Sequence, residues 1–270
     1  MRPRILVSTG TLVGRRNGFD HRMVIKSVGR LSHIDGYELM MLPAYYDKLD
    51  IVAADFAENG INTPVIHFEK EIGAYLSRGS AEDIAEAKRL IALNIKMAKL
   101  SRAERCVLHL WGGPRPDDDL SCAISALGDI IEMCRYDGLL LMVENAPCRI
   151  HDPLSIWREI LSRYDDALFT LDSRFAAFHD QISEITAPEI LSHVRHVHVS
   201  DTAEIPGVFG DIRPILSLGE GRIDFDVFFS SLRGYDGYIT IESPVMLDDG
   251  DVDIVKLSEN CRFVYEYIER

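Results

Sequence analysis

Short apolar runs rich in β-branched residues alternate along the whole chain with longer amphipathic segments. Runs of this length, bounded by Gly, Pro or Asn, predict buried strands. They occur at residues 5–7, 37–42, 64–68, 106–110, 139–143, 167–171, 195–201 and 238–241. The intervening segments predict helices at residues 21–31, 51–58, 81–100, 120–134, 153–164, 226–232 and 252–268, and a less regular helical stretch that ends near residue 193.

Local signals refine these boundaries. Asp20 and Ser80 are suited to cap the helices that follow them. The residues between 68 and 81 include Gly73 and Gly79 and are predicted to form a loop.

Eight strand–helix alternations predict an α/β fold with a parallel sheet and right-handed crossovers, and their number favours a closed barrel. An open, doubly wound sheet is the alternative. Against it, no GxGxxG follows the first strand, and polar residues end strands all along the chain rather than at one switch point. No linker or change of composition divides residues 1–270. We therefore predict one domain, a (β/α)8 TIM barrel.

Charge and cysteine content narrow the class of protein. The 270 residues carry a formal net charge of −14, which argues against nucleic-acid or anionic-membrane binding because Lys and Arg drive attraction to phosphate. The five cysteines include no CxxC pair, which indicates reduced, mostly buried thiols in a cytoplasmic protein. Small and polar residues at 8–11 make the first apolar run a poor signal peptide, and no run approaches membrane-spanning length.

The predicted strand at residues 195–201 reads RHVHVSD and carries two histidines on one face. His196 and His198 are two residues apart, so both rings project to the same side of an extended strand. Val197 and Val199 project to the other side. Metal ligation at the strand end is one interpretation, and a hydrogen-bonded pair of core histidines is the other.

Carboxylates end three further strands in a matching phase. Glu144, Asp172 and Glu242 each follow inward-facing positions of their strands, so with His198 they are expected to point into the mouth of the barrel. Three converging carboxylates would repel one another without compensation, and a divalent cation supplies it. A mixed oxygen and nitrogen set suits Mn²⁺, Zn²⁺, Co²⁺ or Mg²⁺. The alternative is that each acid caps the following helix or pairs with a loop Arg.

Five motifs in this order and spacing resemble the xylose isomerase-like barrels, which comprise sugar isomerases and epimerases and the apurinic/apyrimidinic (AP) endonucleases of family 2. They are VENAP at residues 143–147, LD at 171–172, HVHVSD at 196–201, LGEGRIDF at 218–225 and GYITIES at 237–243. The resemblance spans nearly the whole chain. It implies that Glu144, Asp172, His198 and Glu242 bind one divalent metal ion.

The same resemblance implies a metal-dependent sugar or sugar-phosphate isomerase or epimerase with a small-molecule carbohydrate substrate. In such enzymes the glutamates that match Glu144 and Glu242 transfer protons on either face of a metal-stabilised enediolate. Trp111, His196 and Arg213 are candidate substrate contacts: an apolar wall, an orienting imidazole deeper in the barrel, and a loop cation.

An AP endonuclease-like phosphodiesterase acting on abasic DNA is the alternative function. His67 and His109 match histidines that bind a further zinc ion in those nucleases. The rest of that cluster does not match, because Phe175 stands where they have a His, and Arg213 and Ile215 stand where they have an Asp-x-His. His67 and His109 therefore remain open between a second metal and a sugar-binding pair. A dehydratase or a non-catalytic sugar binder on the same scaffold, and a homo-oligomer, also remain open.

Overall fold

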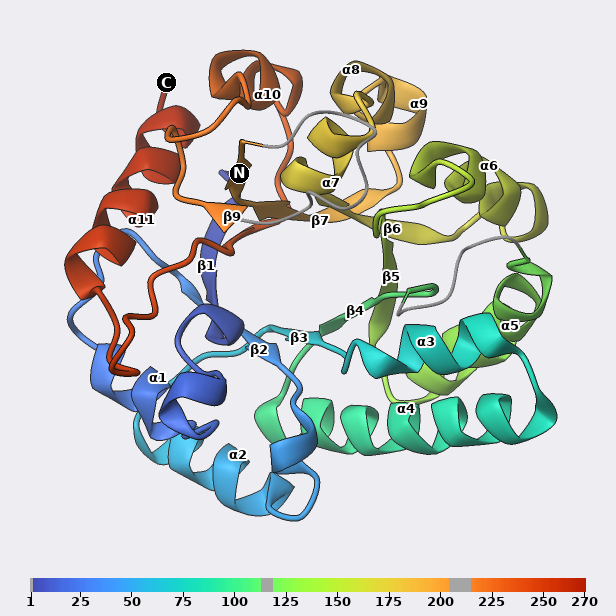
Figure 1. Ribbon diagram of the computed structural model, residues 1–270, viewed down its shortest axis with the longest axis horizontal. Coiled ribbons are helices and arrows are strands. Elements are labelled where there is room, and N and C mark those ends of the chain that lie inside the picture. Colours follow the sequence, from blue (N-terminus) through green and yellow to red (C-terminus); the bar gives the residue numbers. More distant parts are fainter. Residues whose placement is uncertain (1, 113–118, 204–214) are drawn as a thin grey trace.

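The computed structural model describes residues 2–112, 119–203 and 215–270. Within them, eight parallel strands close into a barrel in the order β1-β10-β7-β6-β5-β4-β3-β2 (Figure 1). The barrel strands are β1 (Arg4–Ser8), β2 (Gly36–Met40), β3 (Val65–His67), β4 (Arg105–Leu108), β5 (Leu140–Glu144), β6 (Leu168–Asp172), β7 (Val194–Val199) and β10 (Tyr238–Ile241). Each begins within one residue of its predicted start, and the predicted TIM barrel is confirmed.

A small antiparallel sheet lies outside the barrel. It pairs β8 (Asp201–Thr202) with β9 (Ile215–Leu216). Both strands belong to the connection between β7 and the helix that follows at Phe225–Ser231.

The helices surround the strands (Figure 1). They are α1 (Arg22–Ser27), α2 (Leu49–Glu58), α3 (Glu71–Arg78), α4 (Ala81–Ser101), α5 (Ser121–Tyr136), α6 (Pro153–Arg163), α7 (Ser173–Phe178), α8 (Ile182–Ile185), α9 (Pro188–Leu191), α10 (Phe225–Ser231) and α11 (Ile254–Ile268), with short 3₁₀ turns η1 (Thr9–Thr11), η2 (Arg15–Asn17) and η3 (Pro43–Tyr45). Ser80 caps α4 as predicted, because its Oγ accepts the Asp83 N–H at 3.1 Å.

One helix prediction and one loop prediction were wrong. The helix predicted for residues 21–31 ends at Ser27, because Val28 is extended and Gly29 has a φ of +72°. The loop predicted between residues 68 and 81 instead contains α3, with Gly73 inside it. A Cβ on Gly73 would lie 2.7 Å from the His109 carbonyl oxygen and 2.8 Å from that of Trp111. The glycine therefore serves a close approach of α3 to the end of β4 rather than a turn.

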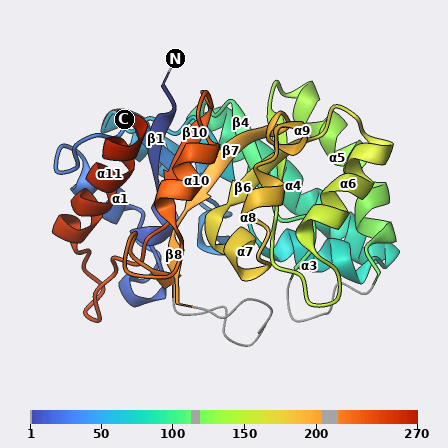
Figure 2. The same ribbon diagram turned by 90° about the horizontal axis from the view of Figure 1, so that it is seen from above.

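The interior of the barrel forms its own apolar layer. Leu6, Val65, Val107, Met142 and Tyr238 are buried together there, separately from the larger core between strands and helices. At the N-terminal ends of the strands, the Tyr238 ring lies between two guanidinium groups, with Arg4 Cζ 4.1 Å and Arg105 Cζ 4.6 Å from its centroid. Figure 2 shows the N-terminus of the chain at the opposite end of the barrel from α3 and α7.

Most of the cysteine thiols lie in the interior. Cys106, Cys134, Cys148 and Cys261 are buried and Cys122 is exposed, as expected for mostly buried thiols. Among the described residues, no helix combines the length and the apolar character that crossing a bilayer requires.

Candidate active site

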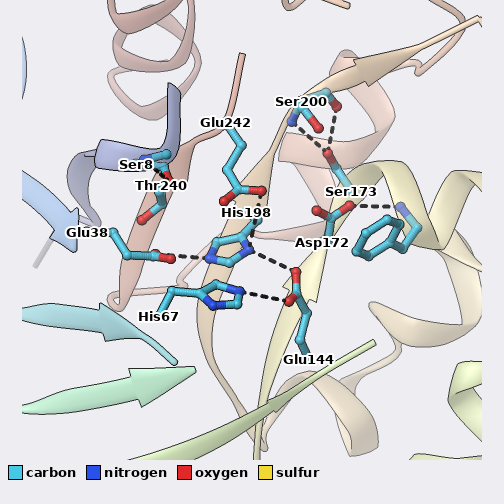
Figure 3. A network of polar contacts seen from close by, with 12 residues as sticks. Ser8, Glu38, His67, Glu144, Asp172, Ser173, His198, Ser200, Thr240 and Glu242 are labelled. Atoms are coloured by element: carbon cyan, nitrogen blue, oxygen red, sulfur yellow. Dashed lines mark hydrogen bonds and ion pairs between the residues drawn. The ribbon is translucent and has the colours of Figure 1, made fainter. Parts of the chain in front are cut away.

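Four of the predicted site residues meet at the C-terminal end of the barrel (Figure 3). Ligand atoms of Glu144, Asp172 and His198 lie within 4.8 Å of one another, and all three side chains are buried. Glu242, the residue after β10, brings its Oε2 to 3.9 Å from His198 Nδ1, and its side chain is 16% exposed. The expected convergence is present, while the role of these residues as metal ligands stays a prediction.

Strand register explains why these side chains converge. His198 of β7 pairs in register with Asp172 of β6 on one side and with Thr240 of β10 on the other. Glu144 of β5 pairs with Thr170 of β6. Because neighbouring parallel strands keep the same pleat, residues in register or two apart face the same side of the sheet.

Three histidines surround the carboxylate of Glu144. His198 Nδ1 lies 3.0 Å from its Oε1. His67 Nε2 lies 3.3 Å from its Oε2, and His109 Nε2 contacts the same oxygen, although burial lowers the pKa of His109 and so favours its neutral form. His67, His109 and Glu144 thus form a second group of potential ligands that shares Glu144 with the first. The two histidines lie close together, and both a second metal site and a sugar-binding pair would require this. The structure therefore leaves both hypotheses open.

The two carboxylate oxygens of Asp172 have different roles. Its Oδ1 accepts the Phe175 N–H at 2.8 Å and so caps α7, as the helix-cap alternative predicted. Its Oδ2 is buried and has no hydrogen-bond partner among the described residues. Asn145 holds the Asp172 backbone, since its Oδ1 accepts the Asp172 N–H at 2.6 Å and its Nδ2 donates to the Asp172 carbonyl at 3.1 Å. This accounts for the Asn of the VENAP motif.

Charge compensation within the site comes from His198. Burial alone would lower the pKa of His198, but the carboxylates of Glu38, Glu242 and Glu144 raise it well above its usual value. Burial would likewise raise the pKa of Glu144, yet His109 and His198 hold it well below the usual range. Burial raises the pKa of Asp172 to about 6, with Arg174 opposing the rise and Glu144 and Glu242 adding to it. A protonated His198 therefore supplies positive charge that a bound cation would otherwise supply.

Glu38 is a site residue that the sequence analysis missed. It lies on β2 with no exposed surface, and its Oε2 is 2.6 Å from His196 Nε2 and 3.0 Å from His198 Nε2. A signal was available, because Glu38 is the one acidic residue of a strand that is otherwise apolar. Its position in mid-strand, rather than at the strand end, set it apart from the other carboxylates.

The other residues that the sequence analysis singled out as substrate contacts have different surroundings. Trp111 is almost fully buried, and its indole Nε1–H donates to the Ala146 carbonyl at 3.1 Å, beside the loop that follows Glu144. His196 lies deeper in the barrel than His198, as expected, and is bonded to Glu38. Phe175 is buried under the guanidinium of Arg174, whose Cζ is 4.5 Å from the ring centroid. Arg213 lies outside the described residues.

Comparison with known proteins agrees with this architecture. The sequence model of the family described as "Xylose isomerase-like TIM barrel" matches residues 29–261. Among curated protein sequences, no match was found.

Similar solved structures are a D-tagatose 3-epimerase-like protein, an L-ribulose 3-epimerase, and a D-allulose 3-epimerase from Methylomonas sp. in complex with D-allulose. The first is 19% identical with a TM-score of 0.70 and covers 100% of this chain and 97% of its own. The second is 15% identical with a TM-score of 0.71 and covers 99% and 95%. The third is 14% identical with a TM-score of 0.70 and covers 99% and 96%. At these identities the likeness is one of fold.

Proposed function

The chain belongs to the xylose isomerase-like TIM barrel family, and from this membership and the site geometry we propose that it is a divalent-metal-dependent sugar isomerase or epimerase. The observation that carries the proposal is the meeting of Glu144, Asp172, His198 and Glu242 from successive strands in one buried cluster. Two of the four are glutamates that approach the cluster from different strands. Such a pair suits proton transfer to and from a carbon atom.

The residues present fit a divalent cation. Asp172 Oδ2 is buried without a partner among the described residues, and the oxygens of Glu144 and Glu242 lie within reach of His198 Nδ1. Three carboxylates and one imidazole form a donor set that suits Mn²⁺, Zn²⁺, Co²⁺ or Mg²⁺. When bound, such an ion would stabilise negative charge on adjacent carbonyl and hydroxyl oxygens of a sugar.

The chain's own side chains would move the proton. Glu144 is kept ionised by His198 and His109, so it is ready to accept a proton from a substrate carbon at neutral pH. Glu242 approaches from β10 and is the more exposed of the two, which suits exchange of its proton with water. His67 and His109 both contact Glu144 Oε2, so they would hold the orientation of the carboxylate that accepts the proton. Because the neighbours in fold include 3-epimerases of ketoses, we propose free ketohexoses and ketopentoses as the first substrates to test.

Deuterium exchange tests the proposal. We expect protein loaded with Mn²⁺ in D2O to incorporate deuterium into D-tagatose, D-allulose or L-ribulose at the carbon that is epimerised, as read by NMR. Glu144→Gln or Glu242→Gln should lower the rate by roughly 10²–10⁴-fold while bound metal, measured by elemental analysis, is retained. Glu132→Gln, an exposed residue of α5, is the matched control and should exchange at the wild-type rate.

Two results would contradict the proposal. One is a wild-type protein that exchanges no proton of any sugar in a panel of ketoses and aldoses. The other is unchanged exchange in both glutamate variants.

The second candidate function is AP endonuclease-like phosphodiester hydrolysis. It is favoured by the second ligand group of His67, His109 and Glu144. It is opposed by the net charge of −14 and by the buried Phe175, which stands where a further metal-binding His is expected. Incision of a duplex with a defined abasic site, lost on chelation, would favour this function over the first.

A further inference from the structure

Glu38 lies beneath the candidate metal centre and faces two imidazoles at once. One oxygen, Oε2, is 2.6 Å from His196 Nε2 and 3.0 Å from His198 Nε2, and Figure 3 shows it on the opposite side of the His198 ring from Glu144. The side chains of all three residues are fully buried. The nearest inward neighbour on β10, Thr240, contacts His196 Nε2 at 3.0 Å through its Oγ1.

Fold stability alone is a poor reason for this arrangement. Removing a carboxylate from water costs several kcal/mol, and buried charged groups are often replaced by apolar residues without loss of stability. Glu38 Oε1 is also buried without a hydrogen-bond partner among the described residues, which adds to the cost. The other inward residues of the barrel include Leu6, Val65 and Val107, so an apolar side chain would match this layer.

The orientation of His198 is what Glu38 controls. An imidazole ring can rotate by half a turn about its outer side-chain torsion, because that torsion has a broad, roughly two-fold profile. With Nε2–H directed at Glu38, the ring presents Nδ1 to Glu144 Oε1 at 3.0 Å and to Glu242 Oε2 at 3.9 Å. The rotated ring would leave Glu38 without this donor.

We propose that Glu38 is a positioning residue: its Oε2 accepts the Nε2–H of His198 and fixes the ring with Nδ1 toward the candidate metal centre, and the same oxygen ties His196 to this arrangement. The inference rests on the proposed function in one respect, that Nδ1 of His198 is a ligand of a divalent cation. A carboxylate behind a ligating histidine sets its tautomer and ring orientation, and its loss weakens metal binding. Glu38 could instead bind an ion together with His196 and His198, whose ligand atoms also lie within 4.8 Å of one another, and the assignment of the metal-bound nitrogen of His198 distinguishes the two roles.

Zinc affinity measures the effect. Glu38→Gln keeps the shape of the side chain but removes its negative charge, so a neutral amide oxygen, which is a weaker acceptor, faces the two imidazole donors. We expect its Zn²⁺ dissociation constant, from competition with a chromophoric chelator, to rise by about 10–100-fold over wild type. Thr240→Val is the matched control, since Thr240 is equally buried and contacts His196 but is not bonded to His198 in the structure; its constant should stay within about threefold. A folded Glu38→Gln variant with wild-type affinity would overturn the proposal.

NMR of the wild-type protein provides a readout that needs no variant. In long-range ¹H–¹⁵N spectra of the zinc-loaded protein, we expect Nδ1 of His198 to have the shift of a metal-bound nitrogen and Nε2 that of a protonated nitrogen. The reverse assignment would overturn the proposal, even if Glu38→Gln failed to fold.

The same spectra separate this inference from the proposed function. A wild-type protein that binds no divalent ion would contradict the proposed function, and the metal-free spectra would then decide the role of Glu38. We expect the Nε2–H protons of His196 and His198 to resonate far downfield in wild type and to move upfield in Glu38→Gln. Resonances unchanged by the substitution would overturn the positioning role.

Discussion

At the scale of single residues, the two oxygens of Asp172 have different surroundings. Oδ1 caps α7, and Oδ2 is buried without a partner among the described residues. Burial raises the pKa of this carboxyl to about 6, from a reference value of 3.8. The folded state therefore binds the proton more tightly than the unfolded state, and ionisation of Asp172 between about pH 4 and 6 lowers the free energy of unfolding.

We expect Asp172→Asn to stabilise the metal-free protein near pH 7.5 by about 1–3 kcal/mol, because it removes an ionised, poorly compensated group. The Asn Oδ1 can still accept the Phe175 N–H, so the cap of α7 is retained. At pH 4 the gain should largely disappear, since wild-type Asp172 is then protonated. Urea unfolding at both pH values, in the presence of a chelator, checks this, and an equal or greater gain at the lower pH would contradict it.

A site residue was predictable where two conditions hold: its position in the strand directs the side chain into the barrel, and it lies at the C-terminal end of the strand. Glu144, Asp172 and His198 satisfy both conditions, and the structure brings them together. Glu38 meets only the first condition, because it lies in the middle of β2. Its partner His198 is also distant in the sequence. A contact across the barrel interior depends on strand order and side-chain reach, which a single strand does not reveal.

At the scale of elements, α3 shows how a glycine can mislead sequence analysis. Gly73 has helical neighbours on both sides, yet it was interpreted as part of a loop because glycine is a poor helix former. The close carbonyl oxygens of His109 and Trp111 supply a reason for glycine that only tertiary contacts reveal.

Substitution of Gly73 by Ala should be destabilising by about 1–3 kcal/mol, because the added Cβ overlaps backbone oxygens that cannot move freely. Helix propensity alone would predict a gain of about 1 kcal/mol. Gly128→Ala in α5 is the control, since its Cβ would meet the movable Tyr164 ring at 3.1 Å. Chemical unfolding of both variants checks this, and a Gly73→Ala protein as stable as the control would count against the close contact.

The LGEGRIDF motif is explained by the contact of its backbone with Asp201. The carboxylate of Asp201 accepts the N–H groups of Gly219, Gly221 and Ile223 at 3.0, 2.8 and 3.2 Å. A Cβ on Gly221 would lie 2.3 Å from Asp201 Oδ1. The motif therefore anchors the chain after β9 to the strand end that carries the histidines.

At the scale of the whole molecule, barrel closure assembles the site. β1 pairs with β10, so the first and last barrel strands complete one ring, and the candidate ligands come from β5, β6, β7 and the end of β10. The repeated strand–helix pattern made this closure predictable. The contacts between loops did not follow from the pattern, because they depend on side-chain packing among distant segments.

A cation that binds several strand ends should stabilise the entire barrel. At a concentration of one hundred times its dissociation constant, Mn²⁺ or Zn²⁺ would add about 2.7 kcal/mol to the free energy of unfolding. For a chain of this size we expect Tm to rise by roughly 5–10 °C, with reversal by chelation. Differential scanning calorimetry measures the shift, and Asp172→Asn should lack most of it. A Tm that none of Mn²⁺, Zn²⁺, Co²⁺ and Mg²⁺ changes would contradict the metal assignment.

Arg4, Tyr238 and Arg105 pack together at the N-terminal ends of the strands, and this packing limits how a small molecule can reach the interior of the barrel. Together with the buried layer of Leu6, Val65, Val107 and Met142, it blocks passage along the axis from that side. Within the described residues, a molecule that reaches the polar cluster would therefore approach it from the C-terminal ends of the strands. A substrate that arrives and a product that leaves would then both pass the C-terminal ends of the strands.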